Sequence, residues 1–391
     1  MEKKKGLSLQ TILTIAGLAL VYLLAFLLDR IPGVPIMLTT VLRKGAIYSL
    51  VAVSMNLLNG FTGLFSLGQA GFMLVGAYTF AAINISSGIR STVYQYYDPL
   101  LNFSLTETLQ GALGNTAGTV LGVFISLLLA GLLAAVLAYL IGLPVLKLKS
   151  DYLAIATLGF AEIVRTVIVW DKLGPLTNGS FPLSRLKTFR SVLEGTVLEK
   201  FSLVMPYFIF AVICITIIVL MIRSSYGRAL RAIRDDEIAA EAMGINLARH
   251  KMISFVTSSF FAGIGGALFA IFQGSVSAAP FTSSMTYEIL LIVVIGGIGS
   301  ITGSVLASTL FIASSEWWLR GLDSGEFLGL HLPIFRNGFR LVVFSVIIMV
   351  FVLFFRRGIM GDHEFDVVAI WENIKKLFGK IFCRRSEGKH E

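Results

Sequence analysis

Long runs of apolar residues divide the chain into segments of membrane-spanning length. Six such runs come before residue 223, at about 11–28, 36–58, 64–85, 118–146, 153–170 and 204–222. Each run is close to the ~20 residues that a helix needs to cross the hydrocarbon core of a bilayer. The pattern therefore predicts six transmembrane helices in the first part of the chain.

The apolar pattern is less regular in the second part. Runs occur at about 252–272, 287–313 and 338–355. The middle run contains a glycine-rich stretch, Gly296 to Ser300 (GGIGS), which can break a helix. If it does, 287–296 and 301–318 are two separate crossings, and the chain has about ten crossings rather than nine.

Basic residues give these runs an orientation, because Lys and Arg accumulate in cytoplasmic loops. Lys147 and Lys149 follow the fourth run, and six Arg or Lys residues lie in 223–251. A cytoplasmic N-terminus puts both segments inside. The predicted organisation is an N-terminal transmembrane half (1–222), a cytoplasmic loop (223–251), a C-terminal transmembrane part of about four crossings (252–356) and a basic cytoplasmic tail (357–391). Helical spacing of apolar residues in the tail predicts an amphipathic helix on the inner leaflet.

Composition excludes several classes of protein. Hydrophobic residues make up 56% of the chain and charged residues 14%, against about 45–50% and about 25% in soluble domains. A soluble enzyme, a disordered protein and a coiled coil are excluded. The basic residues that give the net charge of +9 are expected to face anionic lipid and the cytoplasm. We expect no nucleic-acid partner. The fold class is an all-α polytopic membrane protein.

The sequence carries no recognisable catalytic, cofactor or metal motif. It lacks the G-x-x-x-x-G-K-[ST] phosphate-binding loop, and its four histidines have no metal-ligand spacing. No convergent acids or histidines indicate a membrane enzyme. We therefore expect a chain without catalytic residues or a cofactor of its own.

The cytoplasmic loop has the pattern of two short helices. In the first, Arg228, Arg231 and Arg234 recur at i, i+3 spacing. The second begins at the acids, where Asp235 or Asp236 can cap free N–H groups, and stops at Gly244. Such a slim helix can insert into another protein's groove, although a plain connector between spans has the same pattern. The expected docking residues are Asp235, Asp236, Glu237, Ala240, Glu241, Ala242, Met243 and Gly244.

Several motifs in this order resemble one family. They are Asn59 to Phe72 (NGFTGLFSLGQAGF), Asp151 to Arg165 (DYLAIATLGFAEIVR), Ala229 to Glu237 (ALRAIRDDE), Glu241 to Gly244 (EAMG) and the GGIGS stretch. Together they resemble the LivM-type branched-chain amino-acid permeases of ABC importers. The resemblance covers about 45–310.

The resemblance implies an ABC importer permease fold in the cytoplasmic membrane. It implies three kinds of partner: a homologous second permease, two cytosolic ATPase subunits that bind the ATP, and an extracytoplasmic solute-binding protein. The cargo would be branched-chain or related amino acids, or alternatively another small polar solute such as urea. The stretches Gly60–Gly68 and Gly296–Gly303 are both rich in glycine, as expected of a transporter with two pseudo-symmetric halves. A self-standing channel would not need the capped cytosolic helix.

Polar residues inside the spans are candidates for the substrate path. Glu162 and Arg165 are one helical turn apart at a depth where a lone charge costs about 2.5–3.5 kcal/mol. They either clamp their span to a neighbouring helix or line a path for a zwitterionic solute. A second set either packs helices closely or belongs to a broken helix that exposes backbone groups to substrate. That set is Gly63, Ser66, Gly68 and Gln69.

Overall fold

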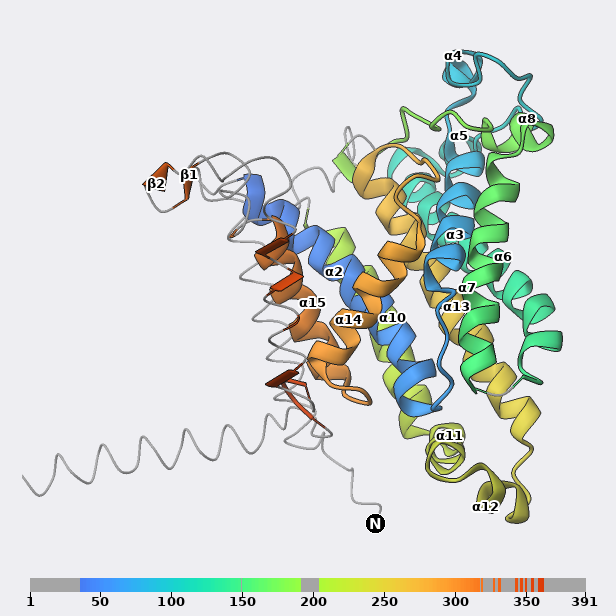
Figure 1. Cartoon of the computed structure of the whole chain (residues 1–391). Coiled ribbons are helices and arrows are strands. Elements are labelled where there is room, and N and C mark those ends of the chain that lie inside the picture. Colours follow the sequence, from blue (N-terminus) through green and yellow to red (C-terminus); the bar gives the residue numbers. More distant parts are fainter. Residues whose placement is uncertain are drawn as a thin grey trace, which may run out of the picture.

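The computed structural model describes residues 36–148, 150–190 and 204–316, with short pieces between 318 and 361 (Figure 1). Helices make up most of this part of the chain, and its named strands are two residues long, β1 (Glu326–Phe327) and β2 (Leu330–His331), which pair antiparallel. The all-α prediction is confirmed. The run predicted at 11–28 lies outside the described residues, as do most of 338–355 and of the tail.

Five of the described helices are long and apolar enough to cross a membrane. They are α2 (Ile36–Asn56) with its π-helical end η1 (Leu57–Phe61), α6 (Asn115–Val145), α7 (Ser150–Val169), α10 (Met205–Arg223) and α13 (Leu247–Gln273). A sixth apolar helix, α3 (Gln69–Asn84), passes the same test together with the short helices that follow it at a sharp bend. The ends of these helices agree with the predicted runs to within five residues. The agreement is expected, because the thickness of the bilayer sets the length of each apolar run.

The GGIGS stretch breaks its apolar run into two helices, as predicted. α14 (Ser283–Gly296) and α15 (Ile301–Glu316) pack side by side around the turn (Figure 1). Gly297 and Gly299 have φ of 113° and 92°, which side chains with a Cβ rarely adopt. With 14 and 16 residues, each helix is shorter than the ~30 Å hydrocarbon core. Packing against α2 shelters both helices; the total of about ten crossings stays a prediction.

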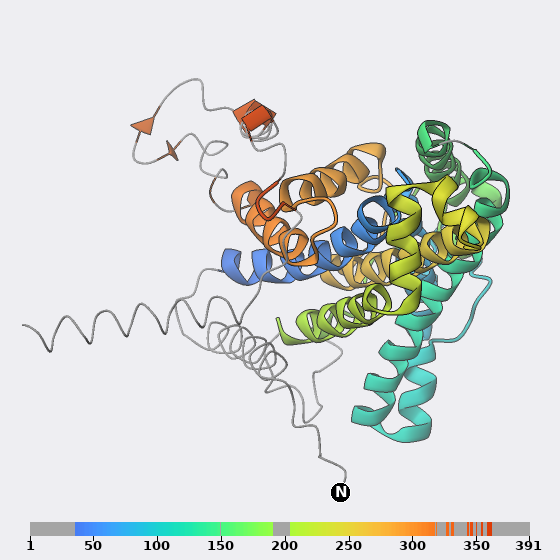
Figure 2. The ribbon, with the colours of Figure 1, turned by 90° about the horizontal axis from the view of Figure 1, so that it is seen from below.

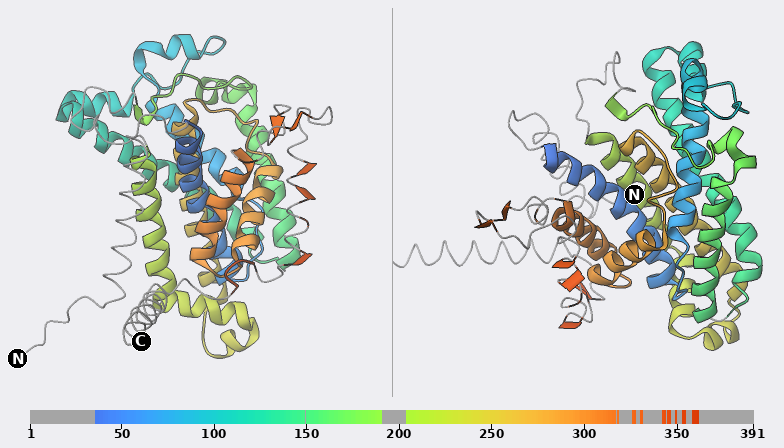
Figure 3. Two further views of the ribbon diagram at one scale, coloured as in Figure 1. Left: turned by 90° about the vertical axis from the view of Figure 1, so that its left-hand side faces the viewer. Right: turned by 45° about the horizontal axis from the view of Figure 1, so that its top comes forward.

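The loop elements gather at two opposite ends of the helix bundle. The yellow-green hairpin of α11 (Ser225–Asp235) and α12 (Glu237–Ala242) lies at one end, which faces the viewer in Figure 2. The short helices α4 (Arg90–Val93) and α8 (Gly174–Thr177) lie at the other end (Figure 3). We call the hairpin end the inner end and the end with α4 and α8 the outer end, after the predicted orientation, which stays a prediction.

The outer end carries a folded cap. Arg90 is 3% exposed and donates hydrogen bonds to four backbone carbonyls, at Ala82, Ile85, Leu101 and Phe103. Glu107 of α5 (Leu105–Leu113) accepts from Ser86 and Ser87 and pairs with Lys187 at 3.3 Å. Burial alone raises the pKa of Glu107, but these bonds and the lysine outweigh it and leave the pKa at about 2. The cap is thus held together by polar contacts among its own residues.

Helices α3 and α13 cross at the centre of the bundle. Helix α13 also packs on α2 and α6. A Cβ at Gly76 would overlap the backbone of Gly263, and one at Gly266 would overlap the carbonyl of Met73. Two helices can approach this closely only where side chains are absent. Backbone-to-backbone contact therefore takes the place of the hydrophobic effect, which does not act between helices in lipid.

Replacing Gly76 with alanine should destabilise this crossing, because the added methyl overlaps the carbonyl of Gly263. Overpacking of this kind costs about 1–3 kcal/mol. We expect a lower unfolding midpoint for the detergent-purified chain, measured by size-exclusion chromatography after heating. Gly111→Ala in α5 is the matched control, since a Cβ there meets nothing within 4 Å. Equal midpoints for the two variants would contradict this contact.

Candidate functional site

The hairpin at the inner end is built from local capping interactions. The Ser224 hydroxyl accepts from the amide of Tyr226 at 3.2 Å and starts α11. Leu230 and Ile233 are buried beneath the helix, while Arg231 and Arg234 are partly exposed, with their guanidinium groups at Phe61 and Gly60. The predicted two-helix pattern with separate apolar and basic faces is confirmed.

The second hairpin helix, α12, starts and stops where the sequence indicates. Asp236 is its N-cap, and its Oδ1 accepts from the amides of Ile238 and Ala239 at 2.8 and 3.0 Å. Gly244 has φ of 83° just past the end. Both features satisfy backbone groups that a helix terminus leaves free.

The predicted docking residues divide into two groups. Ala240 is buried, and three acids have intramolecular roles: Asp235 pairs with Arg234, Asp236 caps α12, and Glu237 binds Lys251 at 2.6 Å. The remaining residues are exposed, namely Glu241, Ala242, Met243 and Gly244. Met243 is 83% exposed and Ile238, which the sequence analysis did not include, is 82% exposed. Two large apolar side chains in solvent on one short helix are typical of a contact surface.

A junction between the two glycine stretches lies just above the hairpin. Asn56, at the last turn of α2, is fully buried. Its side-chain amide donates to the Ser300 carbonyl at 2.9 Å and to the Ser304 hydroxyl at 2.8 Å, and its Oδ1 accepts from the Gly299 amide at 2.8 Å. One side chain thereby satisfies the backbone of the turn between α14 and α15. Asn56 was not predicted from the sequence, because its partners are more than 240 positions away.

The segment between η1 and α3 is extended rather than helical. Ser66, Gly68 and Gln69 are buried there. The Gln69 amide donates to Ser54 at 2.8 Å, and the Leu67 amide donates to the Thr157 hydroxyl at 2.9 Å. Their environment in this structure is helix packing. Gly63, with φ of 74°, is exposed at the inner end next to α11.

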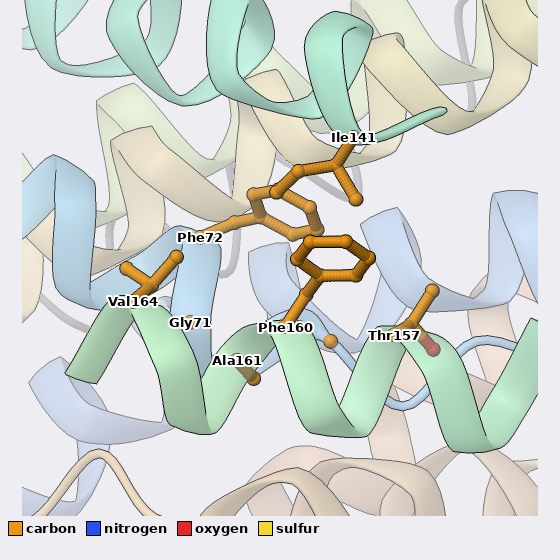
Figure 4. A pocket seen from close by; sticks show the side chains of 8 residues that line it. Gly71, Phe72, Ile141, Thr157, Phe160, Ala161 and Val164 are labelled. Carbon is orange, nitrogen blue, oxygen red and sulfur yellow. The ribbon is translucent and has the colours of Figure 1, made fainter. Parts of the chain in front are cut away.

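The space beside this segment is too small for a solute. Figure 4 shows α7 residues Thr157, Phe160 and Val164 facing Phe72 of α3 and Ile141 of α6. The cavity between them has a volume of about 10 Å³, which is about the room that one water needs. The described part of the chain is closed at this point.

Glu162 and Arg165 form the ion pair that their spacing predicts. Arg165 Nε donates to Glu162 Oε2 at 2.7 Å, and the two side chains are 35% and 37% exposed. The other oxygen of Glu162 accepts from the Ser283 hydroxyl at 2.8 Å, which joins α7 to α14. The pair therefore contacts a second helix and is also accessible from outside the chain.

Polar groups continue along the exposed faces of these two helices. On α7, Gly159 faces open space and Thr166 is exposed. On α14, Ser284, Tyr287 and Glu288 are exposed. Carboxylates and hydroxyls at membrane depth face protein or water rather than lipid, so this face of α7 and α14 requires a partner surface or an aqueous path. The α14 residues were missed, although their i, i+3, i+4 spacing marks one helix face.

A wider hollow lies at the outer end of α7. Its volume is about 610 Å³. The lining combines charged, aromatic and aliphatic side chains, namely Arg165, Thr166, Val167, Val169, Trp170, Asp171 and Ser180. Within the described residues, no group of three or more His, Cys, Asp or Glu side chains is arranged to hold a metal ion.

Comparisons with known proteins identify relatives over most of the chain. The family model described as the permease component of the branched-chain amino acid transport system matches residues 37–354. The high-affinity branched-chain amino acid transport system permease protein LivM of Salmonella typhimurium is 33% identical over 292 residues, 69% of this chain and 61% of that relative. The probable permease LivM of Methanocaldococcus jannaschii is 23% identical over 88% of this chain and 99% of its own length.

A second kind of permease protein also matches. The high-affinity permease protein LivH of Salmonella typhimurium is 28% identical over 146 residues, 37% of this chain and 42% of that relative. The chain thus spans about three fifths of the Salmonella LivM and a smaller share of LivH. No solved structure matches the chain.

Replacing Asn56 with aspartate should weaken the junction while keeping the size of the side chain. The carboxylate loses both amide donors and faces the Ser300 carbonyl, and a buried group left unsatisfied costs about 1–3 kcal/mol. We expect less folded protein in membranes, measured by the fluorescence of a C-terminal fusion in the monodisperse peak. Asn102→Asp is the control, because Asn102 is exposed in the outer cap. Normal yields of the Asn56 variant would show that its hydrogen bonds do not hold the turn.

Proposed function

The chain belongs to the permease family of branched-chain amino acid transport systems, and we propose that it is one permease subunit of an ATP-binding-cassette importer. In this proposal it moves branched-chain or related amino acids across the cytoplasmic membrane, with both termini in the cytoplasm. The energy comes from separate ATPase subunits, in agreement with a sequence that has no phosphate-binding loop. The chain has no ATPase site of its own and is not an enzyme.

The exposed apolar surface of α12 is the observation that carries this proposal. A capped helix that presents Met243 and Ile238 to solvent, with Glu241 beside them, suits insertion into a groove of another protein. The Asp236 cap holds α12 together, and the Glu237–Lys251 pair joins the hairpin to α13. Two cytosolic ATPase subunits would bind the permease pair there.

Three further partners belong to the proposal. Similarity to both LivM and LivH proteins supports a pair of homologous permeases in one transport system. The exposed polar face of α7 and α14 is where the second permease and the path between the two subunits would lie. An extracytoplasmic solute-binding protein would deliver cargo at the outer cap, and membrane lipid surrounds the remaining helix surface.

Arg165 is the residue that we expect to meet the cargo. Glu162 occupies its Nε, and no other hydrogen bond of the guanidinium occurs within the described residues. The two terminal nitrogens are therefore available for a carboxylate, which Arg binds through two parallel bonds. Asp171 lines the same hollow and offers a partner for an ammonium group. This pairing favours a zwitterionic amino acid over the alternative cargo, an uncharged solute such as urea.

Substitution of Gly244 tests the docking proposal. Valine is strained at φ of 83°, at a cost of roughly 1–3 kcal/mol, and should deform the tip without any steric overlap, since a Cβ there meets nothing within 4 Å. We expect Gly244→Val to insert normally but to lose co-purification with the ATPase subunits and uptake. Gly244→Asn is the control, because asparagine tolerates this conformation. Equal uptake by both variants would reduce the hairpin to a connector.

Neutral variants of the ion pair test the path. Loss of a charge-assisted hydrogen bond of about 1.5–3 kcal/mol corresponds to a roughly 10–100-fold weaker interaction. We expect Arg165→Gln to fold normally and to lower uptake of branched-chain amino acids by about that factor. The double variant with Glu162→Gln should stay impaired. If instead each single variant lowered the folded amount and the double variant restored both folding and uptake, the pair would be a structural clamp.

A further inference from the structure

The last turn of α11 contacts the broken end of a membrane helix. Arg234 Nη1 donates to the carbonyl of Gly60 at 3.1 Å, across 174 positions of sequence. Gly60 lies in η1, where the backbone hydrogen bonding of α2 changes from the α to the π pattern. Such π-helical turns leave carbonyls to be satisfied from outside the helix and often occur at functional positions.

The same side chain fills the space next to two other glycines. A Cβ at Gly63 would lie 3.1 Å from Arg234 Cγ, and one at Gly299 would lie 3.3 Å from Arg234 Nη1. Gly60 and Gly299 are themselves in close contact. One arginine therefore packs against both glycine stretches, the one that ends α2 and the one that joins α14 to α15.

A neighbouring acid orients this guanidinium. Asp235 Oδ1 accepts from Arg234 Nε at 3.3 Å and from Nη2 at 3.2 Å, which leaves Nη1 directed at Gly60. Asp235 directly precedes Asp236, the N-cap of α12. One edge of the guanidinium is thus fixed to the hairpin and the other to the membrane helices. Arg231 adds a parallel contact, with its guanidinium 5.6 Å from the centre of the Phe61 ring.

We propose that Arg234 is the positioning residue through which movement of the docking hairpin reaches the two broken helices. The proposal rests on the proposed function, since it assigns a role to the hairpin once ATPase subunits are bound. Gly63 and Gly299, at φ of 74° and 92°, are positions where the backbone can change direction without side-chain strain. Displacement of α12 shifts the Asp235–Arg234 unit, and this unit shifts the ends of α2 and α14 together. A chain of packed and hydrogen-bonded contacts of this kind can carry coupling between distant sites.

The test compares Arg234→Ala with Arg228→Ala in the complete complex reconstituted in lipid vesicles. Arg228→Ala removes the same charge from the same helix, but among the described residues the Arg228 guanidinium donates only to Ser225 of its own helix, at 3.0 Å. Three quantities are measured: ATPase subunits retained on purification, ATP hydrolysed, and leucine taken up. We expect Arg234→Ala to retain the ATPase subunits and to lower uptake per ATP hydrolysed at least tenfold, with Arg228→Ala unchanged.

A second measurement follows the non-helical segment between η1 and α3. In a chain whose Cys214 and Cys383 are replaced by serine, Phe65→Cys places a thiol on this segment, where Phe65 is 40% exposed. ATP should change the rate at which maleimide labels this thiol in the parent complex, and Arg234→Ala should abolish that change. If Arg234→Ala does not accumulate, Arg234→Lys takes its place, because lysine keeps the stem against Gly63 but cannot bind Asp235 and Gly60 through one planar group.

Two results would overturn this proposal. One is unchanged uptake per ATP together with an unchanged labelling response. The other is a fall in uptake that only follows a loss of ATPase subunits, which would make Arg234 a docking residue. Failure of the proposed function has a different signature, since the chain without substitutions would then retain no ATPase subunits at all.

Discussion

The hydrogen bonds of Asn56 are the interaction on which the inner half of this structure depends. A helix that ends inside a bilayer leaves backbone groups that lipid cannot satisfy, at a cost of several kcal/mol each. Two buried helix ends meet here, the end of α2 with η1 and the turn between α14 and α15. Asn56 joins them by bonding to Gly299, Ser300 and Ser304. The two short helices can therefore lie within the bundle without exposing their turn to hydrocarbon.

The two ends of the molecule are held in different ways. The outer end is held by bonds among its own loops, with Arg90 at the centre of four carbonyls and Tyr94 donating to the Leu176 carbonyl at 2.9 Å. The inner end differs because it contacts the membrane helices directly. Its hairpin is stiff within itself and meets the membrane helices through Arg231 and Arg234 at the glycine junction. A capped hairpin that contacts glycines at positive φ suits transmission of movement, and a cap held by buried hydrogen bonds suits recognition.

The features that sequence analysis predicted correctly depend on neighbouring residues. Apolar runs locate the spans because the bilayer sets their length, and the caps of α12 were found because Asp236 and Gly244 act on their own helix. The glycine break was predicted for the same reason, since Gly297 and Gly299 need positive φ. None of these inferences requires knowledge of which helices are neighbours.

The features that were missed depend on contacts between distant segments. Asn56 looks like any polar residue at a helix end until α15 is placed beside it, and Arg234 looks like one member of a basic stripe until Gly60 is found opposite. Gln69 also depends on distant contacts. Its polarity suggested a substrate path, but its hydrogen bonds to Ser54 and Ser258 place it in helix packing. Polarity inside a span shows that a partner exists but not which one.

The most direct test of the central claim is to ask what the tip of the hairpin touches in a living cell. A photo-crosslinking amino acid at Met243, 83% exposed, is compared with one at Tyr96, 68% exposed in the outer cap. The account predicts that light joins Met243 to an ATPase subunit and that Tyr96 forms no such adduct. Absence of an ATPase adduct at Met243, together with labelling of Met243→Cys by a membrane-impermeant reagent added to intact cells, would contradict it.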